Sequence, residues 1–282
     1  MNLSARARKN LQSALAGALL GGLMASPRAG AAAVLGGLNA FAQGVLPFLF
    51  PFSCLAQLLA CGRRAPLWAL RLTGMLGGSP TGARLLAGAG DERAARRSAM
   101  MTGGVSPMFF AGTLALWLDS RAAGAILLAS HLGALALGGL LLPRGQARDI
   151  QTPEVSLPQA VAQSALAMLS VGGCIAMGAL AAALTGAFLP DVPRALLHAA
   201  LEMSGGCRTV ISLAWPRVPT LCLISAACAF SGAAILFQNA GYWRGTGISA
   251  ARLAGYGAIR AALSAALTFV MICICQAMKI AV

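Results

Sequence analysis

Apolar runs of about twenty residues follow one another along almost the whole chain. A helix of that length, at about 1.5 Å per residue, crosses the roughly 30 Å hydrocarbon core of a bilayer. Charged residues make up only 10% of the 282 residues and hydrophobic residues 58%, whereas roughly a quarter of a soluble globular domain is charged. The sequence therefore predicts an all-α polytopic membrane protein and excludes a soluble globular or disordered chain.

Nine apolar stretches can be distinguished, of which seven have the length of a full span. Two others, 65–90 and 194–216, are each interrupted by a cluster of small residues. Each arm then has about ten residues and rises only about 15 Å, which fits a re-entrant helical hairpin better than a crossing. The first run also resembles a signal peptide, but we expect an uncleaved helix because the following chain is equally apolar. The seven expected spans are 10–26, 30–61, 98–118, 122–142, 159–189, 219–240 and 252–278.

The net charge of +14 fits either a nucleic-acid-binding protein or the cytoplasmic loops of a membrane protein. The positions of the basic residues decide between these two classes. With the N-terminus inside and both hairpins re-entrant, the outer side carries only Arg28, Arg121, Arg194, Arg217 and Lys279. The asymmetry follows the positive-inside rule and predicts a multi-pass cell-membrane protein whose partner is the bilayer and not nucleic acid. The cytoplasmic side carries Arg6, Arg8, Lys9, Arg63, Arg64, Arg93, Arg96, Arg97, Arg144, Arg148 and Arg244.

In this layout the two hairpins open to opposite sides of the membrane, which predicts an inverted repeat. The cluster Pro80–Arg84 of the first hairpin parallels Ser204–Arg208 of the second, and a break near Ser106 parallels one near Ser231 at a similar offset. The predicted divisions are an N-terminal helix 1–27, a first repeat 28–142 with hairpin 65–90, a cytoplasmic loop 143–156, and a second repeat 157–282 with hairpin 194–216.

Five motifs, in order and spacing, resemble those of a known membrane-protein family. They are LPFLFPF at 46–52, GGSPTGAR at 77–84, GGVSPMFFAGT at 103–113, LEMSGG at 201–206 and FSGAAILFQ at 230–238. The chain resembles the sporulation integral membrane protein family YlbJ, also called SpoVV, over roughly 28–270. That family carries the nucleoside-recognition Gate domain and is similar to concentrative nucleoside transporters. The resemblance implies transport of dipicolinic acid across the outer forespore membrane of an endospore-forming bacterium. It leaves open whether the protein is a monomer or a homo-oligomer.

Dipicolinate is a planar dianion, and Arg84 and Arg208 each follow one expected hairpin tip. An arginine near mid-membrane costs about 2.5–3.5 kcal/mol on insertion scales, and bidentate pairing with a carboxylate can offset that cost. The pair predicts a clamp for a small organic dianion. The alternative is that one or both arginines pair with the protein, for example Arg208 with Glu202.

Glu202 is the only carboxylate well inside an expected apolar element. It either pairs with a neighbouring arginine or caps the opposed hairpin, or it contacts the substrate or a coupling proton or Na⁺. The glycines near both tips permit helix N-termini to approach an anion, or else permit close helix packing. The predicted substrate-binding set is Arg84, Arg208, Ser79, Thr81, Gly82, Ser106, Glu202, Ser204, Gly205, Ser231 and Gln238.

An intramembrane enzyme is the main rival to a transporter, and the sequence argues against it. The nearest string to a serine-protease motif is Glu202–Gly205, which lacks the preceding glycine, and the four aspartates lie in expected loops. We therefore expect no catalytic residue, no metal and no cofactor, with Na⁺ or H⁺ coupling left open. A nucleoside or other small-solute transporter, or a non-transporting spore-maturation protein, remains the alternative.

Overall fold

The computed structural model describes residues 5–60, 65–146 and 154–280, and every regular element within these ranges is a helix. Arg63, Arg64, Arg148 and Asp149 lie outside the described residues, as does part of the expected loop 143–156. The elements are α1 (Ala5–Ala25), α2 (Pro27–Gly44), α3 (Leu46–Ala60), α4 (Leu67–Gly77), α5 (Thr81–Leu86), α6 (Glu92–Thr102), the π-helical η1 (Phe109–Leu114), α7 (Ala115–Trp117), α8 (Arg121–Leu140), α9 (Leu157–Gly186), α10 (Asp191–Leu201), α11 (Met203–Ser212), α12 (Arg217–Phe230), α13 (Gly232–Tyr242) and α14 (Ala250–Ala277).

In the described part of the chain, four helical segments are long and apolar enough to cross a membrane: α8, α9, α12 with α13, and α14. A fifth arises if α1 and α2, which meet at a bend of 112°, count as one broken span. The chain is thus an all-α, multi-pass membrane protein. The expected span 30–61 is divided at Val45 into α2 and α3, because Pro47 lacks the N–H that would continue the helical hydrogen bonding.

Two pairs of short helices occupy the stretches that are too short to span. Helix α4 packs on α5 across a turn at Gly78–Pro80, and α10 packs on α11 across Glu202. The first turn lies where the small-residue cluster predicted it. The second turn precedes the predicted cluster, because the Glu202 carboxylate caps α11 and Ser204–Arg208 are already helical.

Two further elements are broken at the predicted positions. Helix α6 ends at Thr102, and the backbone from 103 to 106 is non-helical. Helices α12 and α13 are separated at Ser231, whose φ of 76° is left-handed, and Gly232 follows with a φ of 72°. Both breaks are therefore confirmed.

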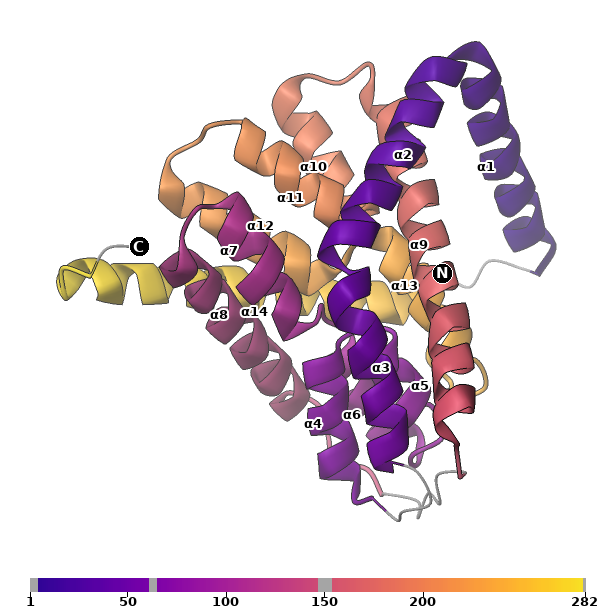
Figure 1. Ribbon diagram of the computed structural model, residues 1–282, viewed down its shortest axis with the longest axis vertical. Helices are drawn as coiled ribbons and strands as arrows, with labels where there is room; N and C mark the ends of the chain where they lie inside the picture. Colours follow the sequence, from indigo (N-terminus) through magenta and orange to yellow (C-terminus); the bar gives the residue numbers. More distant parts are fainter. Residues whose placement is uncertain (1–4, 61–64, 147–153, 281–282) are drawn as a thin grey trace.

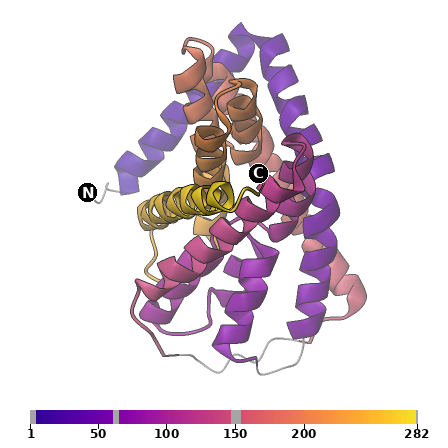
Figure 2. The same cartoon turned by 90° about the vertical axis from the view of Figure 1, so that its left-hand side faces the viewer.

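The helix pairs approach the middle of the molecule from opposite ends. Both views place the orange α10–α11 pair above the yellow helix α14 and the purple α4–α5 pair below it (Figures 1 and 2). The turn between α1 and α2 lies at the upper end of Figure 1, and the start of α4 at the lower end. The two turns thus meet the broken elements near mid-height.

Close packing within the α10–α11 pair depends on Gly206. A Cβ added there would lie 2.2 Å from the Ala199 Cα, whereas one added at Gly173, on an open face of α9, meets nothing within 4 Å. We expect Gly206→Ala to lower the free energy of unfolding by about 1–3 kcal/mol through overpacking. Gly173→Ala is the control, and it should be neutral or stabilise by up to about 1 kcal/mol. Denaturant titration in detergent micelles, followed by circular dichroism, measures both, and equal effects would contradict the packing argument.

Candidate functional site

A small cavity, called here the central cavity, lies where both helix-pair turns, the first break and helix α13 meet. The first turn contributes Ser79, the second contributes Glu202 to Ser204, and the first break contributes Val105 and Ser106. Its volume is about 30 Å³, room for about two water molecules. An organic solute can therefore enter only if the surrounding turns separate. The remaining lining is apolar: Val45, Leu49, Phe109, Val171, Ile175 and Ile235.

The first turn is tied to both broken elements by Ser79. Its hydroxyl donates to Asn239 Oδ1 on α13 at 2.5 Å, and its backbone N–H donates to the Gly104 carbonyl at 2.8 Å. Gly78 beside it has a φ of 64°, and a Cβ there would lie 2.5 Å from the Ser106 nitrogen. Only glycine fits at this point, where one backbone touches another.

Glu202 forms the second turn and is 4% exposed. Its Oε1 accepts from the Ser204 N–H at 2.9 Å and from the Ser204 hydroxyl at 2.7 Å, and its Oε2 accepts from the Gly205 N–H at 2.6 Å. The carboxylate thus occupies the N-terminus of α11, where an external anion would otherwise bind. Glu202 thus caps the second helix of its own pair and not the opposed hairpin, because its carboxylate lies directly at the start of α11.

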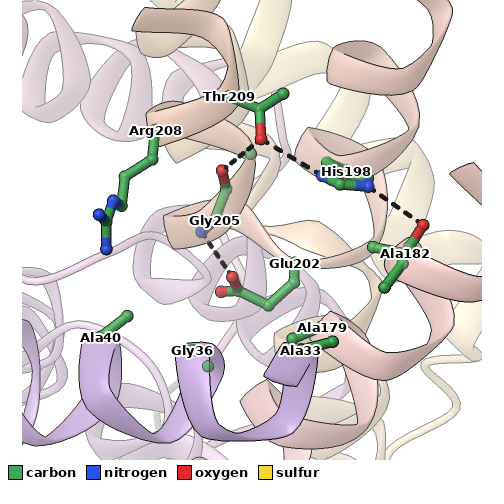
Figure 3. Close-up of a pocket in the computed structure, with 13 residues that line it drawn as sticks. Ala33, Gly36, Ala40, Ala179, Ala182, His198, Glu202, Gly205, Arg208 and Thr209 are labelled. Carbon is green, nitrogen blue, oxygen red and sulfur yellow. Dashed lines mark hydrogen bonds between the residues drawn. The ribbon is translucent and has the colours of Figure 1, made fainter. Parts of the chain in front are cut away.

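A second cavity, called here the lateral cavity, lies between α2, α9 and the α10–α11 pair, and Glu202 lines it as well (Figure 3). Its volume is about 310 Å³. Helices α2 and α9 contribute only alanine and glycine. The polar lining comes from α10–α11: His198, Glu202, Arg208 and Thr209.

A chain of hydrogen bonds connects His198 with Glu202 along the lateral cavity (Figure 3). His198 Nε2 lies 3.1 Å from the Ala182 carbonyl, which only accepts, so this nitrogen carries a proton. Nδ1 lies 3.3 Å from the Thr209 hydroxyl, which donates to the Gly205 carbonyl at 3.0 Å. The Gly205 N–H in turn binds Glu202. The turn and the cavity wall are therefore one hydrogen-bonded unit.

The two predicted arginines are not brought together. Arg84 on α5 donates to the side chains of Gln57 and Gln163 at 3.4 and 3.3 Å. Arg208 points from α11 toward α2 (Figure 3), with its guanidinium carbon 5.5 Å from the centre of the Trp117 ring. Arg208 lines the lateral cavity and a neighbouring one of about 280 Å³ beside Trp117. Among the described residues that line the central cavity, none carries a positive charge.

The other predicted site residues fall into two groups. Ser79, Ser106 and Ser204 line the central cavity with Glu202, and Gly205 lines the lateral one. Thr81, Gly82, Ser231 and Gln238 line neither.

Two of these four residues, Gly82 and Ser231, have structural contacts that explain them. A Cβ at Gly82 would lie 2.5 Å from Thr102, which makes Gly82 a packing residue, and the Ser231 hydroxyl donates to the Gly103 carbonyl at 2.9 Å. Within the described part of the chain, the buried Thr81 hydroxyl and Gln238 amide nitrogen have no hydrogen-bond partner.

Arg260 on α14 holds the two breaks together and was not among the predicted site residues. It is 1% exposed, and its guanidinium donates to the Ala229 and Gly103 carbonyls, both at 3.0 Å, and to the Met100 carbonyl at 3.4 Å. These carbonyls end α12 and α6, where the helix dipole is negative. A lone arginine in a long apolar helix was the available signal, but its acceptors are too far away in sequence to be inferred.

No family model, curated protein or solved structure matches this chain.

Replacing Arg260 tests its role at the breaks. Arg260→Met removes a donor from three buried carbonyls, of which that of Gly103 keeps its bond from Ser231. Because each lost bond to a buried group costs about 1–3 kcal/mol, we expect the free energy of unfolding to fall by at least about 2 kcal/mol. Arg260→Lys should recover part of the loss. The exposed Arg121 provides the control Arg121→Met, and equal unfolding midpoints for the two methionine variants in detergent would refute the role.

Proposed function

We propose that this protein is a membrane transporter for a small organic dianion, with dipicolinic acid moved across the outer forespore membrane as the leading substrate. The observation that carries the proposal is the convergence of two helix-pair turns and two broken helices on one cavity. Non-helical backbone at membrane depth is tolerated where it is shielded by protein or lines a cavity. Discontinuous helices of this kind form the substrate sites of many transporters.

The membrane arrangement that belongs to this proposal has seven spans and two re-entrant hairpins in an inverted repeat, with the N-terminus in the cytoplasm. The arms of the α4–α5 and α10–α11 pairs have 6 to 11 residues, which is half a span or less. A correspondence between the repeats supports it. His131 and Arg260 stand at the same position along α8 and α14, and His131 lies beside Gly104 at the first break while Arg260 binds the Ala229 carbonyl at the second.

The lining of the central cavity bears on the substrate. Hydroxyl groups of Ser79, Ser106 and Ser204 and the ring of Phe109 suit a planar molecule with polar ends. The cation for a carboxylate comes from Arg208 in the adjoining lateral cavity. A nucleoside is the second candidate, because Glu202 in an otherwise neutral cavity can accept hydrogen bonds from a neutral, hydroxyl-rich solute.

Filling the central cavity tests the location of the transport path. Ile235→Trp places a larger side chain in the cavity wall, so we expect uptake of radiolabelled dipicolinate into proteoliposomes to fall at least tenfold. Ile274→Trp makes the same change at a residue that is 52% exposed and should leave uptake unchanged. Uptake of uridine without dipicolinate would favour the nucleoside alternative, and uptake of neither would overturn the proposal.

The arginines are tested in the same assay. Arg208→Ala should raise the KM for dipicolinate several-fold, because its guanidinium lines two cavities, one of which borders the central cavity at Glu202. Arg84→Ala should leave the KM unchanged, because Arg84 binds two glutamine side chains and lines neither cavity. A KM that is insensitive to Arg208→Ala would remove this arginine from the substrate path.

A further inference from the structure

We propose that Glu202 carries a proton along with the transported anion, so that the protein is a proton–anion symporter. The inference rests on the proposed function and deepens it. Glu202 lines both the central and the lateral cavity and forms the boundary between them.

The charge balance of the central cavity calls for such a proton. Glu202 is the one ionisable residue among the described residues that line it. A dianion that enters would meet a carboxylate in an enclosed, low-dielectric space, where like charges repel strongly. No described cation lines this cavity to compensate. A proton on Glu202 removes the repulsion and supplies a donor for a substrate carboxylate.

The lateral cavity gives that proton a route. Its volume of about 310 Å³ holds several water molecules, and it reaches the Glu202 side chain without passing through the central cavity. The route is lined by small residues of α2 and α9 on one side and by the polar residues of α10–α11 on the other (Figure 3).

The charged and titratable groups around Glu202 are few. His198 from α10 and Arg208 from α11 face the lateral cavity, and Arg208 lies on Trp117 with no ion pair to Glu202 among the described contacts. The thiols of Cys207 and Cys228 lie 3.8 Å apart, and Cys228 contacts Met203 behind the turn. The described residues that α2, α3, α9, α13 and the first break bring to the two cavities include no titratable group.

Proton transfer also changes the turn itself. A hydronium ion in the lateral cavity gives its proton to the Glu202 carboxylate, leaving water and a carboxylic acid. The acid has one oxygen that bears hydrogen and no longer accepts well, so the bond from Gly205 weakens if Oε2 is protonated, and both bonds from Ser204 weaken if Oε1 is. The α10–α11 turn is then free to move from the central cavity. When the dianion leaves on the opposite side of the membrane, Glu202 releases its proton to water on that side as well. One net negative charge has then crossed.

The test uses the whole protein in proteoliposomes with the membrane potential clamped at zero. With wild type, an external pH one unit below the internal pH should drive about tenfold accumulation of labelled dipicolinate for one coupled proton. In detergent, a pH-indicator dye should report about one proton taken up for each dipicolinate bound. Both measurements need only the wild-type protein, so they decide the question even if a variant does not fold.

Glu202→Gln tests whether Glu202 or a carboxylate of the substrate itself carries the proton. The variant should still equilibrate dipicolinate across the membrane, but its accumulation should no longer respond to the pH gradient, and the proton uptake on binding should vanish. Glu154→Gln, the same change at an exposed loop residue, should behave as wild type. Wild-type transport that ignores the pH gradient would overturn the symport and leave the proposed function standing. Absence of dipicolinate binding and transport would overturn both.

Discussion

The structure depends on how protein donors satisfy the carbonyl groups at two helix breaks. The Gly103 carbonyl accepts from both Arg260 and Ser231, and the Ala229 carbonyl accepts from Arg260. A single guanidinium therefore joins the ends of α6 and α12, and unpaired backbone groups in hydrocarbon would cost several kcal/mol each. Because Arg260 of α14 fixes the end of α6, the first break is held where Val105 and Ser106 line the central cavity.

Glu202 satisfies a helix terminus from the opposite direction. It caps α11 with a negative charge, as Arg260 caps two helix ends with a positive one. In many anion sites a helix N-terminus is the binding group, but here the protein's own carboxylate occupies it. The charge of the central cavity is consequently set by the protonation of one side chain.

Helix positions were largely predictable from the lengths of the apolar runs, and contacts between distant residues were not. The proline and glycine clusters marked the turn at Gly78–Pro80 and both breaks, because several such residues together disfavour a continuous helix. The Arg84–Arg208 clamp was inferred from symmetry, but α11 begins at Met203, so Arg208 lies more than one turn past the second turn and faces α2. A shift of a few residues at a cap redirects a side chain by the 100° that each helical residue adds.

The two turns differ in chemistry, and that difference limits which of them can respond to a proton. The first turn is held by a neutral hydroxyl–amide bond from Ser79 to Asn239 and by a backbone bond to Gly104. The second is held by the Glu202 carboxylate, which borders a cavity on each side. Protonation can therefore loosen the α10–α11 turn while the α4–α5 turn stays fixed to α13 and the first break. In the proposed transporter, the side of the membrane from which α10–α11 approaches is the one that proton binding opens.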